Sequence, residues 1–562
     1  MREPFYRLTE ESRLFLSRWY LVDWQEPEDR VRDISNHAEK ILWIEWFADK
    51  FYGYISKGYY SLSSPVWSNY WLERWLPISC FWVEVQDYMW DILHCAWELW
   101  MMSKLWWGVG LYFWNLRSRW TDINGNWTSS WSVHFMDMFD KITSSISQWG
   151  TRRWSSSPYL SVDHWDILEF LEIGSEWNPI QWSNTWVVIP EWRMQDMIDW
   201  DKDKRKVWAK VLQSRAEKWF PYLMFKDNCD KWLPQCYKDS GITAKTSQLC
   251  NEIILNTDEN HSFVCCLSSI NLVHRDEIEQ TDAVQTMICF LDSVITEFLN
   301  KLESYRDSNK EEDKKTFHYM EKAYRFAKRE RALWLWVLWR HHLLQSKMIP
   351  FESDETKELN KRIFYTIKRE SEICSAELGM MFWEPELLKW YGQRHSTLLA
   401  IAPTKSSSFI LGNTSQSIEP CLSNYYIKDL AKTKVVVKNP YLVELLKEKK
   451  MNTREVRDSI MDYDGSVQHI DWLTHEEKEV FKTFREIDMQ VVIDQAADRQ
   501  VFIDQSQSLN IMVTQSMSVK DVNELIIDAW KKWIKTLYYQ FSISAAQEAS
   551  RKRKIECIWC SW

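Results

Sequence analysis

Cysteine is the residue type with the clearest chemical potential in this 562-residue chain, and five of its twelve cysteines stand out by their surroundings. Any one of them taken alone is more often a small buried apolar side chain than a reactive group. Cys557 and Cys560 differ, because they form a CxxC pair in a polar, basic stretch without a core to fill. A zinc site would need two more ligands, so a dithiol that exchanges electrons is the better interpretation. The other three are Cys80, Cys250 and Cys265.

Strands and helices of an α/β fold must position these cysteines. Short apolar runs predict strands at 78–85, 186–190, 253–255, 263–272, 398–403 and 509–513. Long amphipathic segments predict helices at 282–305, 311–328, 354–378, 441–449, 475–491 and 519–540. The alternation is typical of a largely parallel sheet with both faces covered. We therefore predict a helical segment over 1–60, a catalytic α/β unit over 61–543 and a flexible tail over 544–562.

Composition excludes several classes of protein. The 70 Lys and Arg residues against 80 Asp and Glu give a net charge of −10, which does not suit nucleic-acid binding. No apolar run reaches the roughly 18 to 20 residues that span a bilayer. The charged N-terminus lacks the apolar core of a secretory signal. These features predict a cytoplasmic protein with reduced thiols and no membrane partner.

Six motifs in order resemble the large, catalytic subunit of class I ribonucleotide reductase, in a short form like those of bacteria and phages. They are SQLCNEI at 247–253, CCLSSINL at 265–272, AIAPTKSSS at 400–408, SIEP at 417–420, FIDQSQSLN at 502–510 and KTLYY at 535–539. The resemblance covers nearly everything from about residue 61 onward. It implies a ten-stranded α/β barrel of the ribonucleotide reductase and glycyl-radical type, with Cys250 on a central finger loop.

The resemblance also implies a radical mechanism that removes the 2′-hydroxyl of a ribonucleotide. Cys250 matches the thiyl radical that abstracts the 3′-hydrogen. Glu252, expected on the same side of an extended segment, matches the general base. Cys80 and Cys265 match the dithiol that supplies the reducing equivalents. Gln248 stands where many members have Asn, and it keeps the amide donor and acceptor for a substrate contact.

Further residues match the family's binding sites and radical pathway. Substrate contacts, mainly to the phosphates, are implied for Ser64, Ser79, Thr404, Lys405, Ser406 and Ser407. Asp87 and Arg117 match the site where a deoxynucleoside triphosphate or ATP selects the base to be reduced. Tyr538 and Tyr539 match the tyrosines that pass the radical from a metal-containing small subunit, so this chain itself is expected to bind no metal.

The implied partners follow from the same chemistry. The resemblance predicts a homodimer that engages a dimeric small subunit. The tail dithiol would reduce the active-site disulfide and be reduced in turn by thioredoxin or glutaredoxin. Residues 1–60 show nothing like the family's ATP cone, which predicts no overall inhibition by dATP through such a domain. Diphosphates are the usual class I substrates, although the sequence does not distinguish them from triphosphates.

The chain has 38 tryptophans but only 12 glycines. Where the family has glycine-rich turns, tryptophan recurs at 106–110, 148–154, 331–339 and 557–562. Glycine serves such turns because it reaches positive φ and lets backbone approach a ligand, which an indole does not permit. We therefore hypothesise that many of these tryptophans are glycines of a source that decodes UGA as glycine. Trp208 and Trp472 are expected to be genuine, because the family often has tryptophan there.

Three alternatives stay open at this point. Two are relatives within the family, one that uses adenosylcobalamin and one that is inactive. The tandem tyrosines argue against the first, because adenosylcobalamin generates the radical in place. The third is a non-enzymatic, tryptophan-rich protein that binds glycans on exposed aromatic rings. It predicts surface rows of tryptophan and no role for Cys250.

Overall fold

The computed structural model describes most of the chain. The described residues are 3–22, 24–73, 75–78, 80–104, 108–130, 132–146, 156–181, 183–199, 201–255, 257–412, 415–430 and 433–542. Ser79 and the predicted tail, with Cys557 and Cys560, lie outside them. No helix of the described part is long and apolar enough to cross a membrane.

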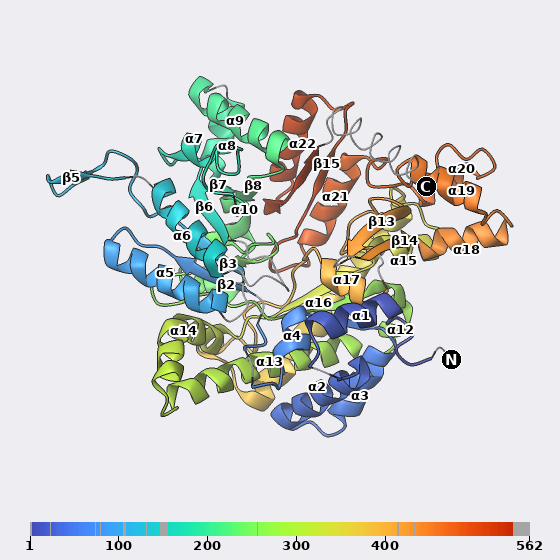
Figure 1. Ribbon diagram of the computed structural model, residues 1–562, viewed down its shortest axis with the longest axis horizontal. Coiled ribbons are helices and arrows are strands. Elements are labelled where there is room, and N and C mark those ends of the chain that lie inside the picture. Colours follow the sequence, from blue (N-terminus) through green and yellow to red (C-terminus); the bar gives the residue numbers. More distant parts are fainter. Residues whose placement is uncertain are drawn as a thin grey trace.

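The larger sheet has six strands in the order β16-β8-β7-β6-β3-β2 (Figure 1). Their bounds are β2 Cys80–Glu84, β3 Gly108–Tyr112, β6 Ser156–Ser161, β7 Trp186–Ile189, β8 Tyr222–Phe225 and β16 Thr536–Leu537. All neighbours are parallel except β16, which is antiparallel to β8. The strands are buried nearly throughout, as expected for a parallel sheet covered on both faces. Helices α5 (Met89–Lys104) and α6 (Ser132–Ile146) pack against β2, β3 and β6.

The second sheet has three strands in the order β1-β11-β12. They are β1 Tyr60–Leu62, β11 Leu267–Asn271 and β12 Trp334–Leu338. The long helices α13 (Ala283–Arg306), α14 (Glu311–Glu330) and α16 (Asp354–Phe382) lie behind it. The N-terminal helices α1 (Glu10–Trp19), α2 (Pro27–Leu42) and α3 (Phe47–Ser56) complete this layer, with α2 and α3 against α13.

Isolated bridges connect the two sheets and extend the second. Phe81 bridges Val264, Leu335 bridges Leu399, and Ile401 bridges Gln507. The predicted α/β class is confirmed. The predicted strand at 398–403 is reduced to two of these bridges, and among the described residues no continuous ladder closes the sheets into one barrel.

The remaining elements connect the sheets or cover their ends. Before β12 in the sequence, the chain also forms α4 Ser64–Asn69, β4 Asp122–Ile123, β5 Trp127–Thr128, α7 Ile167–Phe170, α8 Glu191–Ile198, α9 Lys202–Lys218, α10 Lys226–Lys231, α11 Gln235–Asp239 and α12 Arg275–Ile278. After β12 come α15 Arg340–Ser346, α17 Lys405–Ile410, α21 Met489–Gln500, β15 Ile511–Val513, α22 Val519–Lys531 and β17 Gln540–Ser542. A separate small core joins β13 Tyr425–Leu430, β14 Thr433–Lys438, α18 Pro440–Glu448, α19 Arg454–Asp462 and α20 His475–Val480.

Two predicted helices are wrong in extent. The segment 475–491 forms two helices, because Thr474 caps α20 and Asp488 starts α21 with a second cap. The helix predicted over 519–540 stops at Lys531. Trp533 then takes a φ of 63°, and the chain continues as β16. The helical period predicts a continuous helix across each of these ends, because the cap of α21 and the turn at Trp533 interrupt the pattern only briefly.

Tryptophan occupies backbone conformations that side chains seldom adopt. Of the 20 described non-glycine residues with positive φ, 11 are tryptophan. Trp43 and Trp219 follow α2 and α9 in the left-handed conformation, which is the usual place of a C-terminal glycine. Trp383 has φ 71° and ψ 152°, a region that is essentially restricted to glycine.

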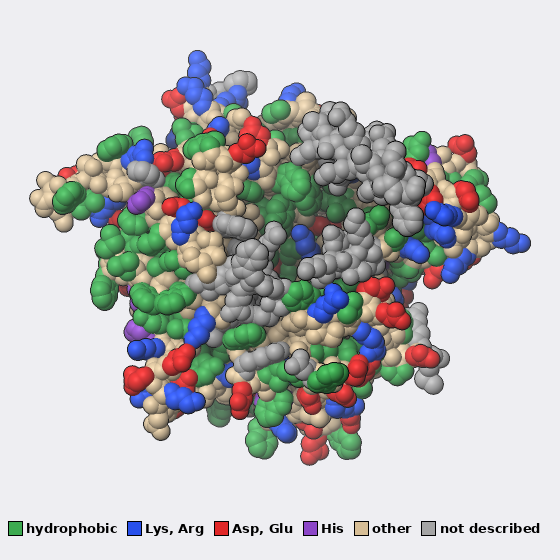
Figure 2. Space-filling view, in the orientation of Figure 1, with side chains coloured by type: hydrophobic (Ala, Val, Ile, Leu, Met, Phe, Trp, Pro, Cys, Tyr) green, Lys and Arg blue, Asp and Glu red, His purple; other side chains and the backbone are tan. Residues whose placement is uncertain are grey.

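The tryptophans also differ from one another in exposure and in the hydrogen bonding of the indole N–H. Trp24 and Trp390 are almost fully exposed, whereas Trp186 and Trp334 are fully buried with no hydrogen-bond partner for the indole N–H among the described residues. Trp208 is different, because its Nε1 donates to Asn523 Oδ1 at 2.7 Å. Figure 2 shows hydrophobic side chains gathered over α5 and α6, with charges of both signs elsewhere on this face.

Candidate active site

Cys250 lies in the turn of a short β-hairpin. Strands β9 (Thr246–Ser247) and β10 (Ile254–Leu255) pair antiparallel, and residues 248–253 form the turn between them. Gln248 N donates to Ile253 O at 2.9 Å, and Asn251 takes a φ of 78°. The extended conformation expected from Cys250 to Glu252 is therefore wrong, because the chain reverses at Asn251. The hairpin itself has the shape of the predicted finger loop.

The finger is supported from both sides. Tyr159 of β6 donates its hydroxyl to Gln248 O at 3.1 Å. From the other side, Ser506 N donates to Glu252 O at 2.7 Å, and the Ser508 hydroxyl donates to Cys250 O. Contacts from the segment 502–510 and from β6 of the larger sheet thus fix the position and direction of the turn.

The Glu252 carboxyl is fully buried beside Cys250. Gln248 Nε2 donates to it, and Ser508 Oγ lies 3.3 Å from its Oε2. Burial raises the pKa of Glu252 to about 7, and these hydrogen bonds oppose the rise. A carboxyl with such a pKa can accept or release a proton near neutral pH, which suits a general base.

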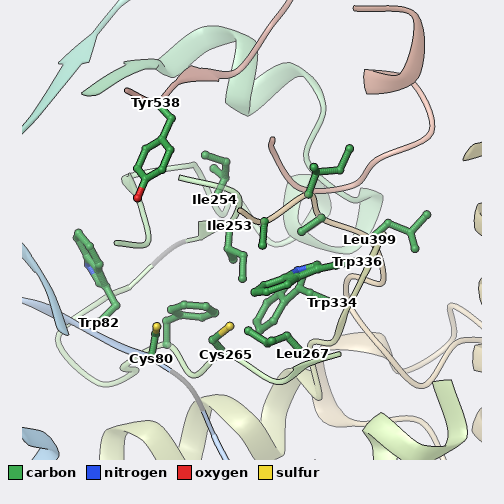
Figure 3. Packing of buried hydrophobic residues seen from close by; sticks show 14 of the residues in the cluster. Cys80, Trp82, Ile253, Ile254, Cys265, Leu267, Trp334, Trp336, Leu399 and Tyr538 are labelled. Carbon is green, nitrogen blue, oxygen red and sulfur yellow. The ribbon is translucent and has the colours of Figure 1, made fainter. Parts of the chain in front are cut away.

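Cys80 and Cys265 lie on adjacent backbone segments. Cys265 N donates to Cys80 O at 3.1 Å, next to the bridge between Phe81 and Val264. Figure 3 shows both thiols side by side below Ile253 of the finger, with the ring of Tyr538 on the far side of the same space. Burial raises the pKa of the Cys265 thiol, which therefore keeps its proton at neutral pH. Cys266 faces elsewhere, donating to Leu291 O at 3.5 Å.

Three indole rings lie beside these thiols. Trp334 and Trp336 project from β12 next to Cys265 and Ile253, and Trp82 lies next to Cys80 (Figure 3). All three are buried. Glycine at these positions would open the same space above Cys80 and Cys265.

Tyr538 and Tyr539 form a compact aromatic group with a third tyrosine that the sequence analysis missed. The ring centroids of Tyr538 and Tyr539 are 4.4 Å apart. Tyr222 of β8 lies 4.4 Å from the first ring and 4.9 Å from the second. Its position after Pro221 at the start of a short apolar run was the available signal. Burial raises the pKa of Tyr538 and Tyr222 well above the usual range, so both stay protonated.

The predicted phosphate contacts lie around the start of α17. Thr404 Oγ1 accepts from Ser417 N at 2.8 Å, and Ser407 O accepts from the Ser61 hydroxyl of β1 at 3.0 Å. Lys405 is exposed, and its ammonium lies 5.6 Å from the ring centroid of Tyr539. Ser64 begins α4, two residues after β1. The structure thus brings this loop next to the tyrosines.

Asp87 and Arg117 also come together. Arg117 Nε donates to Asp87 Oδ2 at 2.7 Å, and both side chains are about one-third exposed. They follow the carboxyl ends of β2 and β3, whereas Cys80 begins β2. The predicted effector site and the predicted dithiol are therefore at opposite ends of one strand.

Comparison with known proteins agrees with this geometry. A family model described as "Ribonucleotide reductase, barrel domain" matches residues 78–202, 193–382 and 383–540. The putative ribonucleoside-diphosphate reductase large subunit of Frog virus 3 is 33% identical over 512 residues, covering 88% of this chain and 87% of that protein. That of Invertebrate iridescent virus 3 is 30% identical over 575 residues, covering 88% of each.

A solved structure extends the match to the three-dimensional fold. The class Id ribonucleotide reductase alpha subunit of Actinobacillus ureae is 44% identical, with a TM-score of 0.89, over 97% of this chain and 99% of that chain. The chain belongs to the ribonucleotide reductase family. Within that family it is a large, or alpha, subunit. The tryptophan-rich glycan-binding alternative is thereby set aside.

Proposed function

We propose that this large subunit is a ribonucleoside-diphosphate reductase that makes 2′-deoxyribonucleotides by thiyl-radical chemistry inside a ten-stranded barrel. The observation that carries the residue roles is the proximity of Cys250 and Glu252 of the finger to Cys80 and Cys265, since, besides burial, the charged forms of the other three groups all raise the pKa of the Cys265 thiol. The test is reduction of cytidine diphosphate by the chain together with its small subunit, with cytidine triphosphate in parallel. If neither nucleotide is reduced, the proposal is contradicted.

In the proposed reaction, the Cys250 thiyl radical takes the 3′-hydrogen atom from the ribose. Glu252 accepts the 3′-hydroxyl proton, and the 2′-hydroxyl leaves as water after protonation by the thiol pair. Cys80 and Cys265 together give two electrons and two protons and close to a disulfide. One proton leaves in the water and the other forms the new C2′–H bond, while Glu252 returns its proton to the 3′-oxygen. Cys250 finally returns its hydrogen atom to C3′ and is again a thiyl radical. Gln248 donates to Glu252 and holds that carboxyl in place.

The radical is proposed to arrive through Tyr539 and Tyr538 from a separate beta subunit, whose metal centre generates it. The class Id alpha subunit that this chain resembles supports such a partner. Thr404, Lys405, Ser406, Ser407 and Ser64 would bind the substrate phosphates. Cys557 and Cys560, outside the described residues, would reduce the Cys80–Cys265 disulfide and be recycled by thioredoxin or glutaredoxin.

The exposed apolar side chains of α5 support self-association. Met89, Trp90, Leu93, Trp97 and Trp100 are all more than two-fifths exposed on this helix. Such a patch on one helix is typical of a protein–protein contact. We propose that it forms part of a homodimer interface.

The pH dependence of the reaction is expected to report Glu252. The general base must be ionised, and its carboxylate form dominates only above a pKa of about 7. We therefore expect kcat/KM to rise about tenfold per pH unit below that value and to level off above it. In Glu252→Gln this rise should disappear, and kcat should fall by about 10²- to 10⁴-fold. Steady-state rates from pH 5.5 to 8.5 measure both. A variant that keeps the wild-type profile would exclude Glu252 as the base.

Effector binding is expected to depend on Arg117. Its guanidinium is one-third exposed beside Asp87, so a phosphate group can reach it, and a hydrogen bond to a charged group contributes about 1.5 to 3 kcal/mol. Arg117→Ala should therefore weaken thymidine triphosphate binding by about 10- to 100-fold in calorimetric titration. Arg119→Ala is the matched control, because Arg119 is similarly exposed but forms its ion pair with Glu169, at 3.8 Å, instead of with Asp87. Equal affinities in the two variants would place the effector elsewhere.

A further inference from the structure

Glu419, in the SIEP segment, has no part in the reaction described above. It nevertheless lies near Tyr539 of the proposed radical pathway and Lys405 of the proposed phosphate site. The segment is fixed by the start of α15, because Arg340 N donates to Ser417 O at 3.2 Å and Cys421 N donates to His341 Nδ1 at 2.8 Å. Glu419 is therefore presented by a rigid turn.

The Glu419 carboxylate contacts a single amide side chain that reaches the tyrosine pair. Asn510 Nδ2 donates to Glu419 Oε1. At its other end, Asn510 Oδ1 accepts from the backbone N–H of Tyr539 at 3.1 Å. Asn510 is buried, so both ends of its amide are held by protein. Glu419 is thus two hydrogen bonds away from Tyr539.

The charge of Glu419 decides which way the Asn510 amide points. An ionised carboxylate only accepts hydrogen bonds, so the NH₂ end of the amide must face it. The carbonyl end is then directed at the Tyr539 N–H. A side chain at position 419 that could both donate and accept would permit the reversed amide, which offers no acceptor to Tyr539.

Tyr539 has few other polar anchors. Asn184 Nδ2 lies 3.4 Å from its hydroxyl, and Ile511 N donates to its carbonyl at 2.9 Å. The ring lies between Tyr538, Tyr222 and Phe541, with the Lys405 ammonium over it. Burial raises the pKa of Glu419 to about 7, and the nearby cations Lys405 and Arg499 oppose this rise, so the carboxylate form dominates above that pH. A change at position 419 would therefore move the ring relative to Tyr538.

We propose that Glu419 and Asn510 are positioning residues for radical transfer, which hold Tyr539 at the separation from Tyr538 that the transfer needs. This inference rests on the proposed function. Each transfer moves one electron and one proton, from the Tyr538 hydroxyl to oxidised Tyr539 and then from the Cys250 thiol to oxidised Tyr538. Both events depend steeply on the distance between donor and acceptor, so a backbone anchor on Tyr539 affects the rate without touching the substrate.

The test traps the radical at the second tyrosine. In the complex with the small subunit, Tyr538→3-aminotyrosine forms a stable radical only after transfer from Tyr539, and electron paramagnetic resonance follows its formation. Misplacement by about 1 Å can slow a reaction by about 10²-fold, so Glu419→Gln and Asn510→Ala should slow trapping by about 10- to 100-fold. Cytidine diphosphate binding should be unchanged, and Glu419→Asp should restore part of the rate.

Glu486→Gln is the matched control. Glu486 is a carboxylate that accepts two hydrogen bonds from Thr483, in the segment between α20 and α21. It should lower the melting temperature as much as Glu419→Gln and leave trapping unchanged. The inference would be overturned if Glu419→Gln and Asn510→Ala both trapped the radical at the wild-type rate. It would also be overturned if Glu486→Gln slowed trapping as much as they do. Tyr539→Phe separates the two failures, because activity in that variant would instead reject the relay of the proposed function.

Discussion

Replacing Cys250 with serine is expected to reduce nucleotide reduction to the background of the assay while leaving the fold intact. Serine has nearly the same size, and the substitution keeps the backbone carbonyl of residue 250, which accepts the hydrogen bond from Ser508. The chemistry fails because a hydroxyl does not form the sulfur radical that abstracts the 3′-hydrogen. Product formation from radiolabelled cytidine diphosphate measures the loss, and thermal melting checks the fold.

Cys289→Ser is the control for this experiment. Cys289 is as partly exposed as Cys250, but it lies on α13, where its sulfur is 3.4 Å from that of Cys374. We expect it to keep most of the activity. Full turnover in Cys250→Ser would contradict the proposed mechanism, whereas equal losses in both variants would indicate general damage from losing a cysteine.

Changing Trp383 to glycine is expected to stabilise the chain, although it removes the largest side chain. A residue held in such a disfavoured backbone region costs about 1 to 3 kcal/mol, and glycine avoids that cost. Trp383 is exposed, so little buried contact is lost. Trp208→Gly is the matched control, in which the free energy of unfolding should fall instead of rise. Trp208 is buried with a bonded indole N–H, so its removal should destabilise by about 3 to 5 kcal/mol. Chemical unfolding measures both.

The same argument applies to all 11 tryptophans with positive φ. It supports recoding, the hypothesis that the natural source decodes UGA as glycine at such positions. At about 1 to 3 kcal/mol each, their combined strain would match or exceed the ~5 to 15 kcal/mol of net stability of a typical domain. We propose that these positions carry glycine in the natural protein. Mass spectrometry of peptide 332–340 from the natural source would show glycine at Trp339, which is one of the 11, and at Trp334 and Trp336, which the hypothesis for the turn at 331–339 also includes. Tryptophan at all three would refute recoding and leave the space beside Cys265 filled.

The sequence predicted the α/β class and the long helices because their periodic patterns are local. It placed α13, α14 and α16 within a few residues, since each is long and amphipathic. It could not predict the turn at Asn251 or the bridges of Leu399 and Ile401, because these depend on partners far along the chain. Motif matching selected residues that the fold brings together, such as Glu252 and Ser508. Tyr222 was missed because no motif contains it.

The finger hairpin receives its support from residues that are synthesised much later. Ser508 and Thr536, which donate to the carbonyls of Cys250 and Asn251, lie 258 and 285 positions downstream of them. Contacts over such separations form slowly, and chains fold from the N-terminus during synthesis. A nascent chain therefore carries Cys250 on an unsupported hairpin until translation is nearly complete. The proposed radical site therefore forms only in the finished molecule, and a stalled or truncated ribosomal product would have no means of directing the proposed chemistry at a nucleotide.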